Sequence, residues 1–429
     1  MLTLNNRYRI YIYKVAAVFV LWFAANLSIV AQKDSHIDSL SKTNVSWAAD
    51  IAVGTVVKAD AYEKQWLHDN CAQTFGAEVR FTPPVTDPFA SDYNQPTLGA
   101  GVRYGHYANV RMRKLPSPEW GQAQMVDYNS RMGDIVTAYA FFERPLWRGR
   151  HWDFDYRFDV GLGIGTHPYN KHNNIDNEII GSRLLIYFGA GFHATYYPTP
   201  TIGLRAGLEF AHHSNGALNR PNKGANFVGP MLGVVANMNR EQQPSKALRI
   251  KKEPYPKRLY STFNIGFGGK TLLEDWLLTQ YATSPDAPSY RKESFHVYHA
   301  FTVQADLMYR YARRWSSGVG VDLFYASAAR RIRQLDQAAG HTDERHSPWS
   351  VGIAAKHEVW WHQFALTMSL GVYLYRHMGF TARDEEKPYY ERIGIKYEIP
   401  HMHGLTIGAN VKAHLTKADQ TEFTLGIRL

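Results

Sequence analysis

Hydrophobic and polar residues alternate along most of the chain, from about residue 97 to the C-terminus. Successive side chains of a strand point to opposite faces, so this period of two predicts strands with one apolar and one polar face. The segment 152–165 shows it clearly, with aromatic and aliphatic residues at even positions and charged residues or glycine at odd positions. Fourteen strands are predicted, near 97–108, 133–146, 152–165, 184–197, 201–213, 226–238, 260–269, 299–311, 318–327, 349–361, 365–375, 391–399, 404–415 and 421–429. Weaker signals at 51–58 and 76–82 would raise the count to sixteen.

Apolar-out, polar-in strands of about ten residues, joined by alternately short and long connections, are typical of a membrane-spanning barrel. We therefore predict an all-β protein, a transmembrane antiparallel β-barrel of about 14 to 16 strands with long external loops. A secreted all-β protein is the alternative. Two connections break the alternation: 239–258 is long where a short turn is expected, and 416–420 is short where a long loop is expected.

The N-terminal segment has the features of a signal peptide. Basic residues precede an apolar run at 15–25 that is too short to span a bilayer, and a plausible cleavage site lies before Gln32. Residues 1–31 are therefore predicted to be removed on export, and the polar residues 32–48 to form a periplasmic extension. After the first 30 residues no run reaches the roughly 18 apolar residues of a spanning helix, which excludes a polytopic helical membrane protein.

Charge and cysteine content narrow the possible partners. The formal net charge of +10 includes three basic residues of the signal segment, and the remaining excess suits anionic lipid headgroups better than nucleic acid. An exported protein makes nucleic acid a still poorer partner. Cys71 is the only cysteine, so neither an internal disulfide nor a cysteine-based zinc site is possible.

One predicted strand–loop–strand unit, 201–236, carries candidate chemistry. Its strand parity places His212 and Ser214 on the outer face, with Arg205, Glu209 and His213 on the lumen side. A histidine and a serine two residues apart on one face meet a requirement of nucleophilic catalysis, a base near the hydroxyl. With 19 histidines in the chain, one His-x-Ser is also expected by chance.

Three asparagines complete this candidate site. Parity directs Asn226 of the returning strand outward, where it could accept the other imidazole N–H and fix the histidine tautomer. Asn215 and Asn222, together with backbone amides of the loop, are candidates for stabilising an oxyanion. A polar outward side chain costs free energy within the apolar band but none at the headgroup level.

The stretch His212-His-Ser-Asn-Gly, followed by Pro221-Asn-Lys-Gly-Ala-Asn, resembles the outer-membrane lipid A 3-O-deacylase (PagL-type) family, also described as acyloxyacyl hydrolases. The resemblance covers roughly residues 52–236. It implies a small barrel with an outward-facing His/Ser/Glu triad that hydrolyses the ester-linked acyl chain at the 3-position of lipid A. It also implies that His212 is the general base, that Ser214 is the nucleophile, and that Asn215 and Asn222 lie near the oxyanion site.

The chain departs from this family in two respects. Fourteen residues after His212, where the family has its glutamate, this sequence has Asn226, which can orient the imidazole but carries no charge. The strands after residue 258 lie outside the resemblance. We therefore predict deacylase-like barrel strands over 49–240, and additional strands over 241–429 that complete the same, enlarged barrel.

The predicted function is that of an outer-membrane serine esterase that hydrolyses an ester-linked acyl chain of lipid A and so remodels lipopolysaccharide. His212, Ser214 and Asn226 would be catalytic, no metal or organic cofactor is expected, and the partner is lipid A, lipopolysaccharide or another membrane lipid in the bacterial outer membrane. The alternatives are a non-catalytic barrel, either a porin or a scaffold, and an outer-membrane phospholipase.

Three other motifs favour structural roles. The polar run Tyr169–Asn174 could bind a cation or a sugar phosphate but is typical of a solvated loop. His401 and His403 flank a predicted turn and could bind a metal weakly, although a surface turn is the simpler interpretation. Trp360-Trp361-His362 next to a short turn indicates an interfacial girdle.

Overall fold

The fold is described from a computed structural model, which describes residues 43–114, 129–237, 254–281, 283–284, 286–382, 387–415 and 417–429. The predicted signal peptide lies outside these residues, as do most of the connection 239–258 and residues 32–42 of the predicted extension. The rest of that extension is not separate from the fold, because the first strand, β1, already begins at Asn44. Among the described residues, no helix is both long and apolar enough to cross a membrane.

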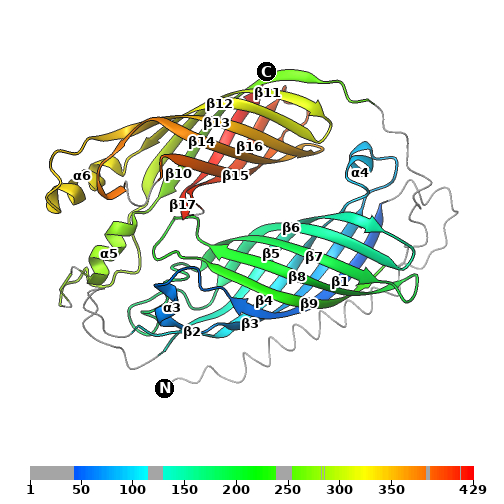
Figure 1. The fold of residues 1–429 in the computed structure, drawn as a ribbon, viewed down its shortest axis with the longest axis horizontal. Helices are drawn as coiled ribbons and strands as arrows, with labels where there is room; N and C mark the ends of the chain where they lie inside the picture. The colour runs from blue at the N-terminus through cyan, green and yellow to red at the C-terminus, as the bar shows by residue number, and fades with distance from the viewer. Residues whose placement is uncertain are drawn as a thin grey trace.

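The described part of the chain forms two barrels of antiparallel strands (Figure 1). In the first barrel β1 pairs with β3 on one side and with β9 on the other, and β4 pairs with β5, so that eight strands close on themselves. A short additional strand, β2 (Leu67–Asp69), pairs with β4. The barrel strands are β1 (Asn44–Val56), β3 (Cys71–Thr82), β4 (Thr97–Met112), β5 (Ser130–Arg148), β6 (Trp152–Gly165), β7 (Leu184–Tyr196), β8 (Ile202–Ser214) and β9 (Ala225–Ala236).

The second barrel is closed by the pairing of its first strand with its last, from Thr262 opposite Arg428 to Gly269 opposite Thr421. Apart from this closing pair, all of its neighbouring strands are consecutive in sequence. The strands are β10 (Arg258–Lys270), β11 (Tyr298–Ala312), β12 (Trp315–Ala326), β13 (His346–Trp361), β14 (Phe364–Met378), β15 (Tyr389–Glu398), β16 (Leu405–His414) and β17 (Lys417–Arg428).

The all-β, transmembrane-barrel prediction is confirmed, and all sixteen predicted strand segments are strands. The expectation of one enlarged barrel is corrected, because the strands close as two barrels of eight. Closure also explains the long connection 239–258. Because the first barrel has an even number of strands, its last strand, β9, ends at the same end of the barrel at which β1 begins. The connection 239–258 therefore links the end of β9 to the start of β10, the first strand of the second barrel.

Both barrels expose an apolar outer surface. Even-numbered residues of β8 point outward, with Leu204 and Leu208 more than half exposed, while Arg205 and Glu209 are buried inside. The second barrel shows the same contrast, since Val319 is 58% exposed and Asp322 is fully buried. We call the end at which β8 and β10 stop the external end, because the longer connections gather there.

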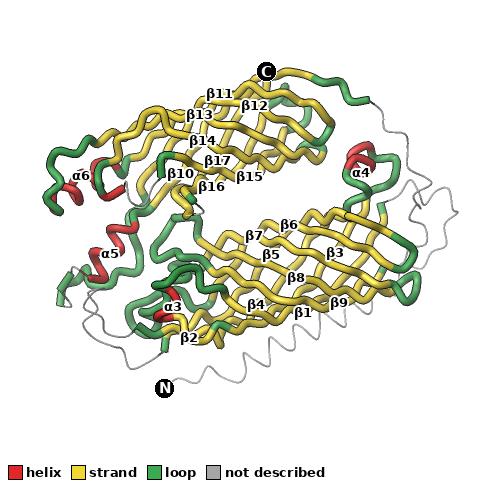
Figure 2. Tube along the Cα trace, viewed as in Figure 1, coloured by secondary structure: helices red, strands yellow, loops and turns green. Residues whose placement is uncertain are grey.

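In the part of the chain that the structure describes, four short helices lie outside the strands. Those at the external end are α3 (Glu63–Trp66), α5 (Leu273–Tyr281) and α6 (Ala329–Ala338), and α4 (Pro88–Asp92) lies at the opposite, periplasmic end (Figure 2). A cluster of buried apolar side chains, including Tyr107, Ile179 and Phe227, fills the external mouth of the first barrel. The connection between β6 and β7 contributes to this plug.

Ion pairs fill the interiors of both barrels. Eight strands enclose a space about wide enough for side chains alone, and charges inside it need partners. In the first lumen Arg157 donates to both carboxylate oxygens of Glu78, at 3.0 and 2.7 Å. In the second, Lys356 lies 2.7 Å from Asp306 and 2.6 Å from Asp322. Such buried ion pairs occupy the polar interiors of both barrels.

Candidate active site

The β8–β9 hairpin presents the candidate residues at the external end of the first barrel. Residues 202–214 of β8 pair with β7 and β9, and His212 lies directly opposite Asn226 in the register. His212, Ser214 and Asn226 are half-buried on the outer face, whereas His213 is buried in the lumen. The predicted parity of the strand is thus observed at each of these residues.

His212 and Asn226 are joined by a hydrogen bond of 2.8 Å between Nδ1 and the amide oxygen Oδ1. Because an amide oxygen only accepts, Nδ1 carries the proton and Nε2 keeps its lone pair. Nε2 contacts no described hydrogen-bonding partner, so it is the nitrogen available to act as a base. Among the described residues no carboxylate forms an ion pair with His212.

Ser214 ends β8, two residues after His212. Residues two apart on a strand have Cα atoms roughly 6.5–7 Å apart, within reach of a histidine and a serine side chain. No hydrogen bond joins the two in this structure. Catalytic hydrogen bonds commonly shorten only when substrate is bound.

The two asparagines predicted near the oxyanion site play different parts. Asn222 Oδ1 accepts the backbone N–H of Asn215 at 2.8 Å, which ties the two ends of the β8–β9 loop together. Asn215 is buried, and its side-chain amide donates to Asn219 O at 3.1 Å. Asn215 therefore shapes the loop, while no described residue accepts a hydrogen bond from the side-chain amide of Asn222.

Backbone donors follow directly after the nucleophile candidate. Gly216 and Ala217 both have positive φ, +61° and +66°, and both are buried. Neither backbone N–H donates to a described residue. Adjacent N–H groups of this kind form concave sites for anions and are common components of oxyanion holes. Backbone amides of this loop were among the oxyanion donors expected from the sequence. The glycine at position 216 is the residue type that most readily adopts a positive φ.

The remaining sequence motifs lie in folded structure. Asn174 is buried and donates to the carbonyls of His167 and Pro168, so it holds the backbone of its loop. His401 and His403 are exposed in the turn between β15 and β16. Over the described residues, no group of three or more His, Cys, Asp or Glu is placed to hold a metal ion.

The predicted aromatic girdle at 360–362 is corrected in part. Trp360 points into the second barrel, where its indole N–H donates to Glu358 at 3.0 Å and to Ser316 at 3.1 Å. Trp361 packs beside Tyr93, which follows α4 of the first barrel. Parity explains the error, because a pair of consecutive residues at a strand end necessarily faces in two directions.

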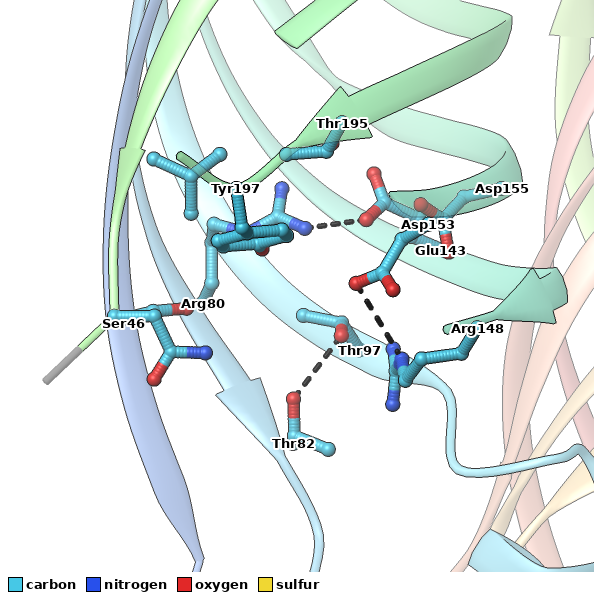
Figure 3. A pocket seen from close by; sticks show the side chains of 12 residues that line it. Ser46, Arg80, Thr82, Thr97, Glu143, Arg148, Asp153, Asp155, Thr195 and Tyr197 are labelled. Atoms are coloured by element: carbon cyan, nitrogen blue, oxygen red, sulfur yellow. Dashed lines mark hydrogen bonds and ion pairs between the residues drawn. The ribbon is translucent and has the colours of Figure 1, made fainter. Parts of the chain in front are cut away.

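The lumen of the first barrel contains a small polar cavity near its periplasmic end (Figure 3). Its volume is about 20 Å³, and its lining includes Arg80, Glu143, Asp153 and Asp155. That space holds about one water molecule and no lipid. The outer-surface hairpin is therefore the better candidate for chemistry on a membrane substrate.

Comparison with known proteins assigns both halves of the chain. Residues 99–235 match the model of a family described as lipid A 3-O-deacylase (PagL), and residues 258–429 match one described as acyloxyacyl hydrolase, C-terminal domain. The two matches fall within the first and the second barrel. No curated protein sequence matches the chain.

Three of the solved structures that the chain resembles illustrate the level of similarity. The outer membrane enzyme PagL is 12% identical, with a TM-score of 0.27, and the match covers 43% of this chain and 97% of that one. The alcaligin outer membrane receptor FauA from Bordetella pertussis is 9% identical, with a TM-score of 0.21, over 90% of this chain and 76% of that one. The ferric enterobactin receptor PfeA from Pseudomonas aeruginosa is 10% identical, with a TM-score of 0.25, over 90% and 68%.

Because these TM-scores are low, the assignment relies on the two family matches and on the barrels themselves. The predicted resemblance and the predicted outer-membrane location are both confirmed. The chain is an outer-membrane β-barrel protein that belongs to the lipid A 3-O-deacylase (PagL) family and carries that family's acyloxyacyl hydrolase C-terminal domain as a second barrel.

Proposed function

We propose that this protein is a serine esterase that hydrolyses an ester-linked acyl chain of lipid A. The observation that carries the proposal is the hydrogen bond between His212 Nδ1 and Asn226 Oδ1, on the outer face and two residues from Ser214. It leaves His212 Nε2 as a base on the same face as the Ser214 hydroxyl. The family supports lipid A as the substrate class.

In the proposed reaction Ser214 Oγ attacks the ester carbonyl while His212 Nε2 takes the hydroxyl proton. The tetrahedral intermediate then expels the sugar alkoxide, which receives the proton from His212, and an acyl-enzyme remains. Water, deprotonated by His212, then attacks that ester, His212 returns the proton to Ser214 Oγ as the acyl bond breaks, and the fatty acid is released. Asn226 keeps the imidazole in the tautomer that both steps need.

The backbone N–H groups of Gly216 and Ala217, with the side-chain amide of Asn222, are the proposed donors to the oxyanion. Removing one such donor typically costs about 10² to 10³ in kcat. Asn215 contributes indirectly, since its own N–H is occupied by Asn222. In this proposal the backbone N–H groups, and not Asn215, contact the oxyanion of the intermediate directly.

The external position of the site suits a lipid substrate. Ser214 lies where the apolar outer surface of β8, with Leu204 and Leu208, gives way to the polar β8–β9 loop. An acyl chain could lie along the exposed leucines while the sugar headgroup stays at the loops. Arg220 of this loop adds positive charge, which suits an anionic headgroup, whereas the charge of Lys223 is paired with Asp60 at 2.7 Å.

A decisive experiment compares purified wild type with Ser214→Ala and His212→Ala on lipid A, with the product masses as readout. The wild type is expected to remove one acyl chain and both variants to remove none. Ser347→Ala, a serine at the external end of the second barrel, is the matched control and should behave as wild type. Equal activity of wild type and Ser214→Ala would refute the assignment.

A phospholipase is the second candidate, because the partner of His212 is an asparagine and not a carboxylate. Offering phospholipid vesicles to the same variants separates the two substrates. A Ser214-dependent release of fatty acid from phospholipid, with none from lipid A, would favour the phospholipase. The porin alternative finds no support in lumens that buried ion pairs fill.

A further inference from the structure

The second barrel contacts the first at the segment that follows Ser214. Thr421, at the external end of β17, donates its hydroxyl to the carbonyl of Gly216 at 2.7 Å. Thr271, directly after β10, donates both its backbone N–H and its hydroxyl to the carbonyl of Ala217, at 2.9 and 2.8 Å. In return, Arg220 donates to the carbonyl of Thr271 at 2.9 Å. These four hydrogen bonds thus hold three residues of the β8–β9 loop, Gly216, Ala217 and Arg220, to the other barrel.

These contacts are buried and they act on a strained backbone. Ala217 and Thr271 are both fully buried, so their polar backbone groups need protein partners. Ala217 has φ of +66°, a left-handed conformation that is unfavourable for a residue with a Cβ and persists only where its surroundings impose it. The two donors of Thr271 meet the carbonyl of this same residue. The second barrel therefore helps to impose the conformation of the loop.

Planarity of the peptide bond passes this restraint to the proposed oxyanion donors. The carbonyl of Gly216 and the N–H of Ala217 belong to one rigid peptide unit, so the Thr421 bond fixes the direction of that N–H. The preceding unit contains the carbonyl of Asn215 and the N–H of Gly216, and its carbonyl accepts from Leu218 N at 3.2 Å. Thr421 thus anchors the carbonyl opposite the N–H of Ala217. Thr271 acts one step further away on the N–H of Gly216, because the Ala217 carbonyl that it binds shares a peptide unit with the Leu218 N–H that holds Asn215.

We infer that the second barrel is a positioning element of the active site, in which Thr421 and Thr271 orient the backbone N–H groups of Gly216 and Ala217 toward the oxyanion. The inference rests on the proposed esterase function and assigns a role to residues 258–429. The two threonines are positioning residues, since they touch the loop and not the substrate. They should therefore change kcat more than KM.

Simple docking of two barrels is the competing explanation, and the periplasmic end provides a control for it. There the hydroxyl of Tyr93 donates to the carbonyl of Trp360 at 2.7 Å, also buried and also between the barrels. If the contacts only hold the barrels together, Tyr93→Phe and Thr421→Val should have similar effects. If the threonines position the loop, only the external contact should matter for catalysis.

The experiment measures kcat and KM for lipid A deacylation by the full-length protein in detergent micelles. Thr421→Val and Thr271→Val each remove a hydroxyl with little change in shape, and the double variant removes both. The double variant should lower kcat about 10- to 100-fold, because small misplacements of catalytic groups cost about this much, with KM within about twofold. Thr421→Ser and Thr271→Ser, which keep the hydroxyl, should retain most of the activity.

Two controls separate the possible outcomes. Tyr93→Phe and Thr424→Val, a change on β17 away from the first barrel, should leave kcat unchanged. An unchanged kcat in the double variant, while Ser214→Ala is inactive, would overturn the positioning role and leave the esterase intact. An equal loss in Tyr93→Phe would overturn it in favour of docking. If Ser214→Ala is as active as wild type, the proposed function itself fails.

Discussion

Replacing Asn226 by a carboxylate should accelerate the enzyme. Asn226 Oδ1 accepts the Nδ1 proton of His212 at 2.8 Å, which fixes the tautomer but supplies no charge. When His212 takes the proton of Ser214 the ring becomes a cation, and a neutral amide stabilises it weakly. Asn226→Asp keeps the shape of the side chain and adds one negative charge. Asn226→Glu restores the residue type that the family resemblance places here.

The size of the effect follows from the separation of the two charges. With the centres of the carboxylate and the imidazolium about 4 Å apart, Coulomb's law gives about 4 kcal/mol at an effective dielectric constant near 20. Partial desolvation of the new carboxylate offsets some of this attraction. If about 1.4–2.7 kcal/mol of the attraction remains as net stabilisation of the transition state, kcat should be about 10- to 100-fold higher. In serine proteases, the opposite change of carboxylate to amide lowers kcat about 10⁴-fold.

Single-turnover deacylation of lipid A, followed by product mass, measures this change directly. Asn226→Gln, neutral and as long as glutamate, is the matched control and should not exceed wild type. Asn226→Ala removes the acceptor and should lower kcat about tenfold or more, since the imidazole loses its orientation. If both acidic variants are no faster than wild type, or if the alanine variant is as active, Asn226 does not orient the base.

Three further predictions concern the barrels. Arg157→Met leaves the buried carboxylates of Glu78 and Asp159 without this partner. It should lower the free energy of unfolding by about 3–5 kcal/mol in a urea titration in lipid vesicles, and an unchanged midpoint would contradict this. In planar bilayers the wild type should produce no stable ion conductance, because ion pairs fill both lumens; steady single-channel steps would contradict this. Burial alone would raise the pKa of Asp336, but hydrogen bonds from Thr381, from His346 and from backbone N–H groups lower it below its ordinary value. A carboxyl with a lowered pKa stabilises the fold above its unfolded pKa of about 3.9, and this contribution is lost as pH falls through the lowered folded value. The destabilisation by Asp336→Asn should therefore shrink at acid pH, and a pH-independent difference in unfolding would contradict the role of its charge.

Much of the candidate site could be predicted because it is local. Parity along one strand places His212 and Ser214 on the same face, and a hairpin of known loop length brings Asn226 opposite His212. Neither step needs information from distant parts of the chain. The same locality explains why the strand segments were found, since each shows its own alternation of polar and apolar residues.

Two features of the site could not be predicted in this way. The binding of the Asn215 N–H by Asn222, and the choice of Gly216 and Ala217 among the loop amides as the proposed oxyanion donors, depend on which hydrogen bonds the folded loop satisfies. The anchoring by Thr271 and Thr421 joins residues 54 and 205 positions apart. Two threonines at strand ends carry no pattern that would single them out in the sequence.

The sequence by itself determined the strands, their inner and outer faces and the orientation of the catalytic candidates, because alternation of side chains is a property of each strand alone. Only the tertiary structure decided that sixteen strands close as two barrels of eight, with β1 against β9 and β10 against β17. Alternation specifies which face a residue takes but not which edge its strand will pair with. Barrel closure requires hydrogen bonds between edge strands that are far apart in the sequence. It also places the second barrel against the loop that follows Ser214.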